Sequence, residues 1–157
     1  MEVAAFADIE SEFLQRVHTM VWCNVATIDS QGRPRSRVLH PIWVGSTGWI
    51  ATRRTSHKAK HIAARPYVSL AYVSDIARPV YADCYAEWDD SPETKQWLWD
   101  QFLNAPPPLG YDPAPIFGSI DDPGFGVLKL TPWRIELVQF PEPPRIWRNP
   151  AVQVLDS

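Results

Sequence analysis

Residues 50–62, Ile-Ala-Thr-Arg-Arg-Thr-Ser-His-Lys-Ala-Lys-His-Ile, are the stretch around which the rest of the chain is interpreted. The first residues continue an apolar run typical of a strand, and the last ones are typical of a helix with one apolar side. A strand that leads into a helix leaves unpaired backbone N–H groups at the helix start, where the helix dipole also favours an anion. Hydroxyls and cations at such a junction indicate a phosphate site.

Three side chains at this junction are the candidates for phosphate binding. Ser56 is the expected N-cap of the helix, Lys58 lies within its first turn, and Thr52 at the end of the strand faces the same pocket. The segment also fits an ordinary capped surface helix with solvated Lys and Arg. Taken alone, residues 50–62 do not decide between these two interpretations.

The preceding strand carries further cations. Arg33, Arg35 and Arg37 point the same way because side chains alternate between the two faces of a strand. Residues 33–60 contain seven Lys or Arg and no Asp or Glu, whereas the whole chain has a formal net charge of −3. A positive pocket on an acidic protein indicates a small anionic ligand. Nucleic acid is not expected as a partner, because the chain has no repeated basic and aromatic pattern.

Four motifs follow one another along the chain: Gly32-Arg33-Pro34-Arg35-Ser36-Arg37-Val38, Trp49-Ile50-Ala51-Thr52, Ser56-His57-Lys58 and Ile62-Ala63-Ala64-Arg65-Pro66-Tyr67-Val68-Ser69-Leu70. In this order they resemble the pyridoxamine 5′-phosphate oxidase-like flavoproteins. The resemblance extends roughly from Phe13 to Val138. It implies a split β-barrel that binds FMN at the interface of a homodimer.

The resemblance also implies which residues hold the cofactor. Arg37, Val38 and Leu39 match an Arg-x-Val-Leu-like strand of the family, and Arg35 is the second choice because the register is uncertain by one alternation. His57 stands where the family pattern usually has Arg, which weakens one phosphate contact. The implied cofactor-binding set is Arg35, Arg37, Val38, Leu39, Thr52, Ser56, His57, Lys58 and Trp147, the last from a Trp147-Arg148 pair near the C-terminus.

The expected fold is mainly β (α+β), a six- to seven-stranded antiparallel split β-barrel with flanking helices. A chain of 157 residues, 45% hydrophobic and 21% charged, fits one domain over residues 1–157. We expect helices over about 8–19 with Asp8 as cap, 57–64, and 92–103 with Ser91 as cap. Expected strands are 21–28, 33–44 with an edge or bulge at Pro41, 49–52, 67–73, 80–88, 125–130 and 133–140. The tail from Pro141 is expected to be Pro-rich and extended.

Residues 104–124 contain six prolines and little periodicity. We therefore expect a long irregular excursion, of the kind that often forms a lid or a binding segment.

Few residues are candidates for acid–base or nucleophilic catalysis, and no catalytic residue is singled out. A flavin would account for this, because the cofactor itself carries the electrons. An FMN-dependent oxidoreductase acting on an unknown small molecule, with a nicotinamide electron donor, is therefore expected.

His57 and His61 would need a third ligand to hold a metal, so no metal site is expected. For His40, a core role and a role at the flavin edge are both open.

Two other functions remain open at this stage. One is a deazaflavin-dependent reductase of the same fold, and the other is a flavin-binding stress or sensor protein without catalysis. Pyridoxamine phosphate oxidation itself is not expected, because the family's true oxidases have a longer, basic C-terminal segment and this chain ends with Val154-Leu155-Asp156-Ser157 soon after Arg148.

The location and the redox state follow from what the sequence lacks. Residues 1–12 contain four acids and no base, unlike a secretory signal, and no apolar run is long enough to span a membrane. A cytoplasmic protein is expected, with no membrane partner. Cys23 and Cys84 lie in apolar, strand-like runs and are expected to be buried free thiols.

Overall fold

One nine-stranded sheet forms the framework of the molecule. The computed structural model describes residues 1–152. The strands are β1 (Glu2–Val3), β2 (Cys23–Ile28), β3 (Pro34–Leu39), β4 (Ile42–Val44), β5 (Thr47–Arg53), β6 (Tyr67–Tyr72), β7 (Val80–Trp88), β8 (Phe125–Gln139) and β9 (Glu142–Arg148). The helices are a 3-10 turn at Phe6–Asp8, α1 (Glu10–Met20), α2 (His57–Ala64), α3 (Pro92–Asn104) and α4 (Ala114–Phe117). The expected mainly β (α+β) class is confirmed, with more strands than expected.

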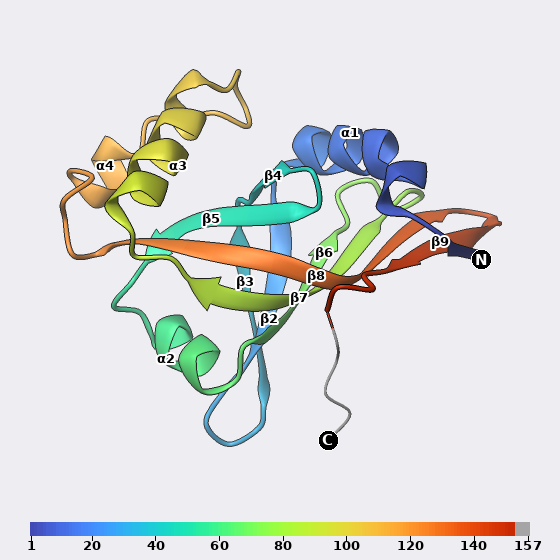
Figure 1. The fold of residues 1–157 in the computed structure, drawn as a ribbon, viewed down its shortest axis with the longest axis horizontal. Coiled ribbons are helices and arrows are strands. Elements are labelled where there is room, and N and C mark those ends of the chain that lie inside the picture. Colours follow the sequence, from blue (N-terminus) through green and yellow to red (C-terminus); the bar gives the residue numbers. More distant parts are fainter. Residues whose placement is uncertain (153–157) are drawn as a thin grey trace.

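The long strand β8 organises the sheet (Figure 1). The strand order is β1-β9-β8-β7-β6-β2-β3, and β5 also pairs with β8 and carries β4 on its other edge. The first part of β8 pairs with β5, from Phe125 to Leu130, and its last part pairs with β9. All the pairs are antiparallel except β1 with β9. β3 has one paired edge, so the barrel stays open between β3 and β5.

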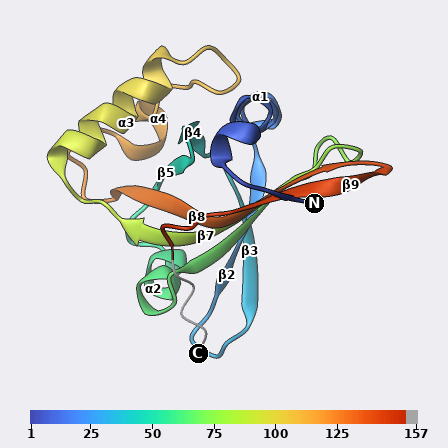
Figure 2. The same ribbon diagram turned by 45° about the vertical axis from the view of Figure 1, so that its right-hand side comes forward.

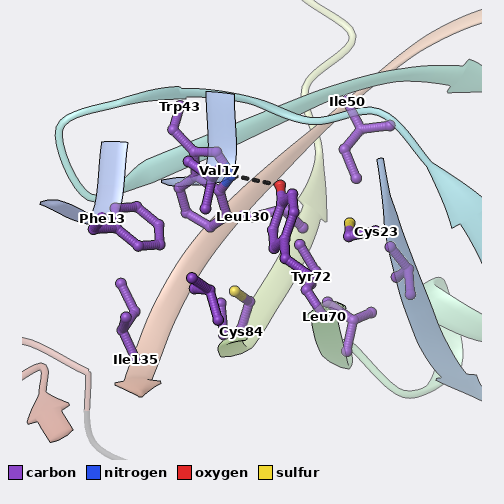
Figure 3. Close-up of a cluster of buried hydrophobic side chains, with 14 of the residues drawn as sticks. Phe13, Val17, Cys23, Trp43, Ile50, Leu70, Tyr72, Cys84, Leu130 and Ile135 are labelled. Carbon is purple, nitrogen blue, oxygen red and sulfur yellow. Dashed lines mark hydrogen bonds between the residues drawn. The ribbon is translucent and has the colours of Figure 1, made fainter. Parts of the chain in front are cut away.

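The main core lies where α1 covers the sheet (Figure 3). Phe13 and Val17 of α1 pack with side chains from β4, β6, β7 and β8. The Trp43 indole Nε1–H donates a 2.9 Å hydrogen bond to the hydroxyl of Tyr72, which is fully buried. Cys23 and Cys84 are free and buried in this core, as expected, and burial raises the pKa of both thiols.

A second, smaller core joins the excursion to the sheet. α3 and α4 lie together at one end of the molecule, away from α2 (Figure 2). Their buried side chains meet residues of β4 and β8, and the cluster consists of Ile42, Leu98, Phe102, Phe117, Phe125 and Val127. α3 begins where the sequence predicts, with the Ser91 hydroxyl accepting a hydrogen bond from the Thr94 N–H. Among the described residues, no helix is long and apolar enough to cross a membrane.

Several boundaries differ from the expectation. The first helix begins at Glu10, because the Asp8 carboxylate accepts from the Ala5 N–H and closes the preceding 3-10 turn instead. The expected strand over 33–44 is interrupted at His40-Pro41 and forms two strands, β3 and β4. The two expected last strands are one, β8, and the expected tail is a ninth strand, β9. Residues 154–157 lie outside the described part of the chain.

Candidate functional site

A largely apolar cavity of about 400 Å³ lies at the open side of the barrel. Its walls come from three segments that are far apart in the sequence: the turn into β2 together with the end of β3, the end of β5, and the excursion. The lining residues are Trp22, Val38, Leu39, His40, Ala51, Thr52, Arg53, Pro108, Tyr111, Ile116 and Phe117. Three predicted cofactor residues, Val38, Leu39 and Thr52, are thus brought together in one cavity.

The predicted phosphate-binding junction lies beside this cavity, between β5 and α2. Thr52 is 6% exposed at the end of β5, and Lys58 is 8% exposed in the first turn of α2. The Lys58 ammonium donates a 3.4 Å hydrogen bond to the Ser56 hydroxyl. Burial lowers the pKa of Lys58, and the nearby positive charge of Arg37 lowers it further. Within residues 1–152, no carboxylate lies within ion-pair distance of this ammonium.

The arginines of the β2–β3 hairpin fall into two groups. The Asp29 carboxylate accepts a 2.9 Å hydrogen bond from the Arg33 side chain and lies 3.9 Å from the guanidinium of Arg35. Arg37 is exposed, forms no ion pair among the described residues, and is the arginine that acts on Lys58. The sequence left open whether Arg35 or Arg37 lies at the junction. In the structure Arg37 lies near Lys58, whereas Arg35 lies near the Asp29 carboxylate.

Ser56 behaves differently from the sequence expectation for an N-cap, while His57 begins the helix as expected. The backbone of Ser56 is extended, as at an N-cap, but its side chain caps no helical N–H and donates instead to the Arg53 carbonyl at 3.0 Å. The first-turn N–H groups of α2 are therefore left without a side-chain cap from Ser56. His57 is exposed at the first position of α2.

Trp147 is a predicted cofactor residue that the structure places away from both the cavity and the β5–α2 junction. It is 5% exposed in the main core on β9, and its ring lies 5.1 Å from that of Phe6. β9 is separated from β3 by four strands of the sheet, β8, β7, β6 and β2. Within one chain, Trp147 therefore serves the packing of the N-terminal turn.

His40 and the excursion complete the cavity, and the sequence assigned them no definite role. His40 is 9% exposed, and its ring lies 4.8 Å from Trp22, 5.4 Å from Phe102 and 5.1 Å from Tyr111. Burial lowers its pKa, while a hydrogen bond with the Leu109 backbone acts in the opposite direction. The signal available in the sequence was His40 before Pro41, where a strand that loses a backbone donor turns away from the sheet.

The part of the excursion over the cavity, residues 105–118, forms a roof with a fixed shape. The Tyr111 N–H donates to the Phe102 carbonyl at 2.9 Å, and the Gly110 N–H donates to the Pro106 carbonyl at 3.0 Å. A Cβ at Gly110 would lie 1.8 Å from the Ala105 carbonyl oxygen, so no other residue fits there without a backbone shift. The roof is therefore attached to α3 by backbone contacts.

Metal chemistry finds little support in the residues that the structure describes. No group of three or more His, Cys, Asp or Glu side chains gathers there in an arrangement that would hold a metal ion. His57 and His61 lie four residues apart on α2, without a third ligand from the described part of the chain.

An open split barrel, with a buried cation that has no carboxylate partner within residues 1–152 at a strand-to-helix junction, indicates the class of protein. The pyridoxamine 5′-phosphate oxidase family matches residues 9–139, most of the sheet and all of the site just described. The chain belongs to this family. A search of curated proteins gives no match.

Solved structures confirm the fold. A protein from Clostridium acetobutylicum related to general stress protein 26 of B. subtilis superposes with a TM-score of 0.73 at 16% identity, covering 90% of this chain and 94% of that one. An FMN-binding protein related to pyridoxamine 5′-phosphate oxidase from Nostoc punctiforme has a TM-score of 0.65 at 18% identity, covering 96% and 94%. An F420 reductase has a TM-score of 0.55 at 16% identity, covering 73% and 88%.

Proposed function

We propose that this protein binds FMN, with the phosphate held at the β5–α2 junction and the flavin ring in the adjacent cavity. The observation that carries the proposal is Lys58, a buried ammonium without a carboxylate partner among the described residues and close to a second cation, Arg37. Burying an unpaired charge is unfavourable, and a phosphate would relieve it.

The residues at the junction fit a phosphate group. The Lys58 ammonium and the Arg37 guanidinium would supply charge-assisted hydrogen bonds, and the Thr52 hydroxyl would supply a neutral one. The Ser56 hydroxyl would first have to leave the Arg53 carbonyl. Ser56 leaves the N–H groups at the start of α2 uncapped by its side chain, and the helix dipole adds to their attraction for an anion. Val38, Leu39 and Ala51 offer apolar walls to a flat ring.

A bound flavin would supply hydride and electron transfer, so the chain needs few reactive side chains of its own. We infer an oxidoreductase acting on a small molecule, with a nicotinamide as electron donor. The FMN-binding relative from Nostoc punctiforme supports the choice of cofactor. The F420 reductase of the same fold supports the second candidate, a deazaflavin cofactor, whose acidic tail would also meet Arg37 and Lys58.

We also propose that the protein is a homodimer in the cytoplasm. β3 is an edge strand whose residues are exposed up to Val38, and Val38 and Trp22 expose 60% and 55% of their surfaces beside the cavity. Apolar side chains at an open strand edge favour burial against another chain. Two buried free thiols are consistent with a reducing compartment.

The absorbance spectrum of the purified protein tests the proposal, measured before and after incubation with excess FMN and removal of the unbound cofactor. We expect flavin bands at about one FMN per chain. A protein that rejects FMN but retains F420 would move the assignment to the deazaflavin. A protein that retains neither would refute cofactor binding. Oxidation of NADH or NADPH by the loaded protein then separates an enzyme from a flavin-binding sensor.

A further inference from the structure

Among residues 1–152, Arg53 is the one charged side chain that lines the cavity. It is the last residue of β5, and side chains alternate between the two faces of a strand. Arg53 therefore shares a face with Ala51, which packs against the second core beside the excursion. Thr52, the proposed phosphate contact, shares the other face with Ile50 of the main core. Arg53 thus belongs to the roof side of β5 and not to the phosphate side.

The Arg53 guanidinium is joined to the roof by one contact. It donates a 3.4 Å hydrogen bond to the Ile116 carbonyl and so links the end of β5 to α4. A guanidinium has five N–H donors, and within the described residues Arg53 forms no other side-chain hydrogen bond and no ion pair. Because Arg53 is also exposed, its remaining donors are accessible to a ligand.

Arg54, the next residue, has its charge paired. Its guanidinium lies 3.1 Å from the Asp90 carboxylate and 4.5 Å from the centre of the Trp88 ring. Two neighbouring arginines thus carry the same charge in different surroundings. Arg54 has a carboxylate partner, whereas Arg53, at the cavity, has none in the part of the chain that the structure describes.

The cavity is largely apolar at the end near Arg53. The roof contributes Pro108, Tyr111, Ile116 and Phe117 to its lining. No Asp or Glu within residues 1–152 lines the cavity. The carboxylate of the roof itself, Asp112, accepts a 3.0 Å hydrogen bond from the Ala114 N–H in the turn into α4. A ligand with an apolar body and an anionic group would therefore place its body against the roof and its charge at Arg53.

We propose that the roof end of the cavity is the substrate site and that Arg53 selects a flat, apolar molecule carrying a single carboxylate. The guanidinium fork matches the two oxygens of a carboxylate. One guanidinium also balances the single charge of a carboxylate, whereas a phosphate monoester carries about −1.5 to −2 and would leave charge uncompensated against apolar walls. This proposal rests on the proposed function, because it assigns the other end of the cavity to the flavin.

The test uses 2-naphthoate and 2-naphthamide, which have nearly the same shape and differ in charge. Calorimetric titration near neutral pH gives both affinities for the wild-type protein, Arg53→Gln and Arg54→Gln, each cofactor-free and loaded with FMN. We expect the ratio of naphthoate affinity to naphthamide affinity to fall about fivefold in Arg53→Gln, the upper end of the contribution of one exposed ion pair. Arg54→Gln removes the same charge one residue away and should leave this ratio nearly unchanged.

Three results would overturn the assignment of Arg53 to a carboxylate. The wild-type protein could fail to bind 2-naphthoate, a result that needs no variant to fold. The ratio could stay unchanged in Arg53→Gln, or fall equally in both variants, which would mean that general positive charge is responsible. The preference for FMN over riboflavin could be lost in Arg53→Gln, because Arg53 would then hold the cofactor phosphate.

The cofactor-free and loaded proteins separate this inference from cofactor binding. Displacement of 2-naphthoate by FMN would overturn the inference, since the cavity would then belong to the cofactor alone. Failure of FMN to bind would refute the proposed function, while an Arg53-dependent ratio in the cofactor-free protein would still support a carboxylate site at the roof end.

Discussion

Two clusters of cations lie at opposite ends of the sheet, and they differ in whether their charges are paired. Near α1, the guanidinium groups of Arg16, Arg78 and Arg145 all contact the single carboxylate of Glu12. Near α2, Lys58 and Arg37 form no ion pair among the described residues. Both clusters include a nearly buried cation, Arg16 at 3% and Lys58 at 8% exposure. The first cluster has its counter-ion within the fold, whereas residues 1–152 provide no carboxylate in ion-pair contact with the second.

The paired cluster ties separate parts of the chain together. Glu12 and Arg16 belong to α1, Arg78 lies in the turn before β7, and Arg145 lies on β9. Arg16 also donates to the Val138 carbonyl at 2.6 Å. We infer that this cluster contributes to stability and that the cluster near α2 contributes to binding. The following predictions test this division, from the largest effect to the smallest.

Glu12→Gln should have the largest effect. It removes the carboxylate that three arginines share and leaves the buried Arg16 without a counter-ion. We expect the free energy of unfolding to fall by about 3 kcal/mol, the lower end of the cost of depriving a buried ion of its partner. Denaturant unfolding checks this, with Glu10→Gln on the same helix as control. A loss no larger than that of the control would contradict the structural role of the cluster.

Arg37→Ala should weaken FMN binding by about 1.5–3 kcal/mol, the contribution of a charge-assisted hydrogen bond. The matched control is Arg33→Ala, because Arg33 lies on the same face of the hairpin but is paired with Asp29. Flavin fluorescence titration measures both. Equal losses in the two variants would mean that general positive charge, and not the position of Arg37, holds the cofactor.

Lys58→Met should stabilise the cofactor-free protein by about 1 kcal/mol, since an apolar side chain of similar length removes a buried, unpaired charge. This sign is opposite to that expected for Glu12→Gln. Thermal unfolding without cofactor gives the comparison. Clear destabilisation would show that Lys58 has an internal partner and would remove the main support for the phosphate site.

Asp29→Asn should have the smallest effect, a loss of stability near neutral pH that disappears as the pH falls toward about 2. The pKa of Asp29 is lowered to about 2, first by the backbone N–H of Arg33 and then by Gln31 and the Arg33 side chain. A carboxyl with a lowered pKa stabilises the folded state above its ordinary value of 3.8, and this contribution is lost as the pH falls toward about 2. The variant should show less loss of stability between pH 4 and pH 2 than the wild-type protein.

Local signals in the sequence predicted much of the fold. Ser91, Pro92 and the apolar positions after them specify the start of α3, and residues 57–64 form the predicted helix α2. Pro41 was expected to disturb one strand as an edge or bulge, and it separates two strands, β3 and β4. In each of these places, neighbouring residues alone decide the backbone.

The strand boundaries that were predicted wrongly depend on pairing with strands that are distant in the sequence. Pro132 looked like the end of a strand, but β8 continues because the register between β7 and β8 shifts at Asp83 and Cys84, opposite this proline. The missing N–H is tolerated at such a bulge. Pro143 similarly lies beside the irregularity between Leu137 and Gln139 in the pairing of β8 with β9.

The candidate site was predictable where its residues are close in sequence. The motif from Thr52 to Lys58 identified the junction, whereas the pairing of Asp29 with Arg33 and Arg35 became visible only in the folded hairpin. The contact of His40 with Tyr111 joins residues 71 positions apart, and no local pattern predicts it. Trp147 was expected at the flavin because the Trp147-Arg148 pair resembles the C-terminal part of the family, and its place on β9 is set by the pairing with β8.

The most direct test of the central claim compares FMN with riboflavin, which lacks the phosphate. Their dissociation constants should be measured for the wild-type protein, for Lys58→Met and for Lys60→Met, a control that removes an exposed lysine from the same helix. We predict that the preference for FMN falls about 10- to 150-fold in Lys58→Met, the equivalent of one charge-assisted hydrogen bond, and changes little in Lys60→Met. An unchanged preference in Lys58→Met would show that the phosphate lies elsewhere.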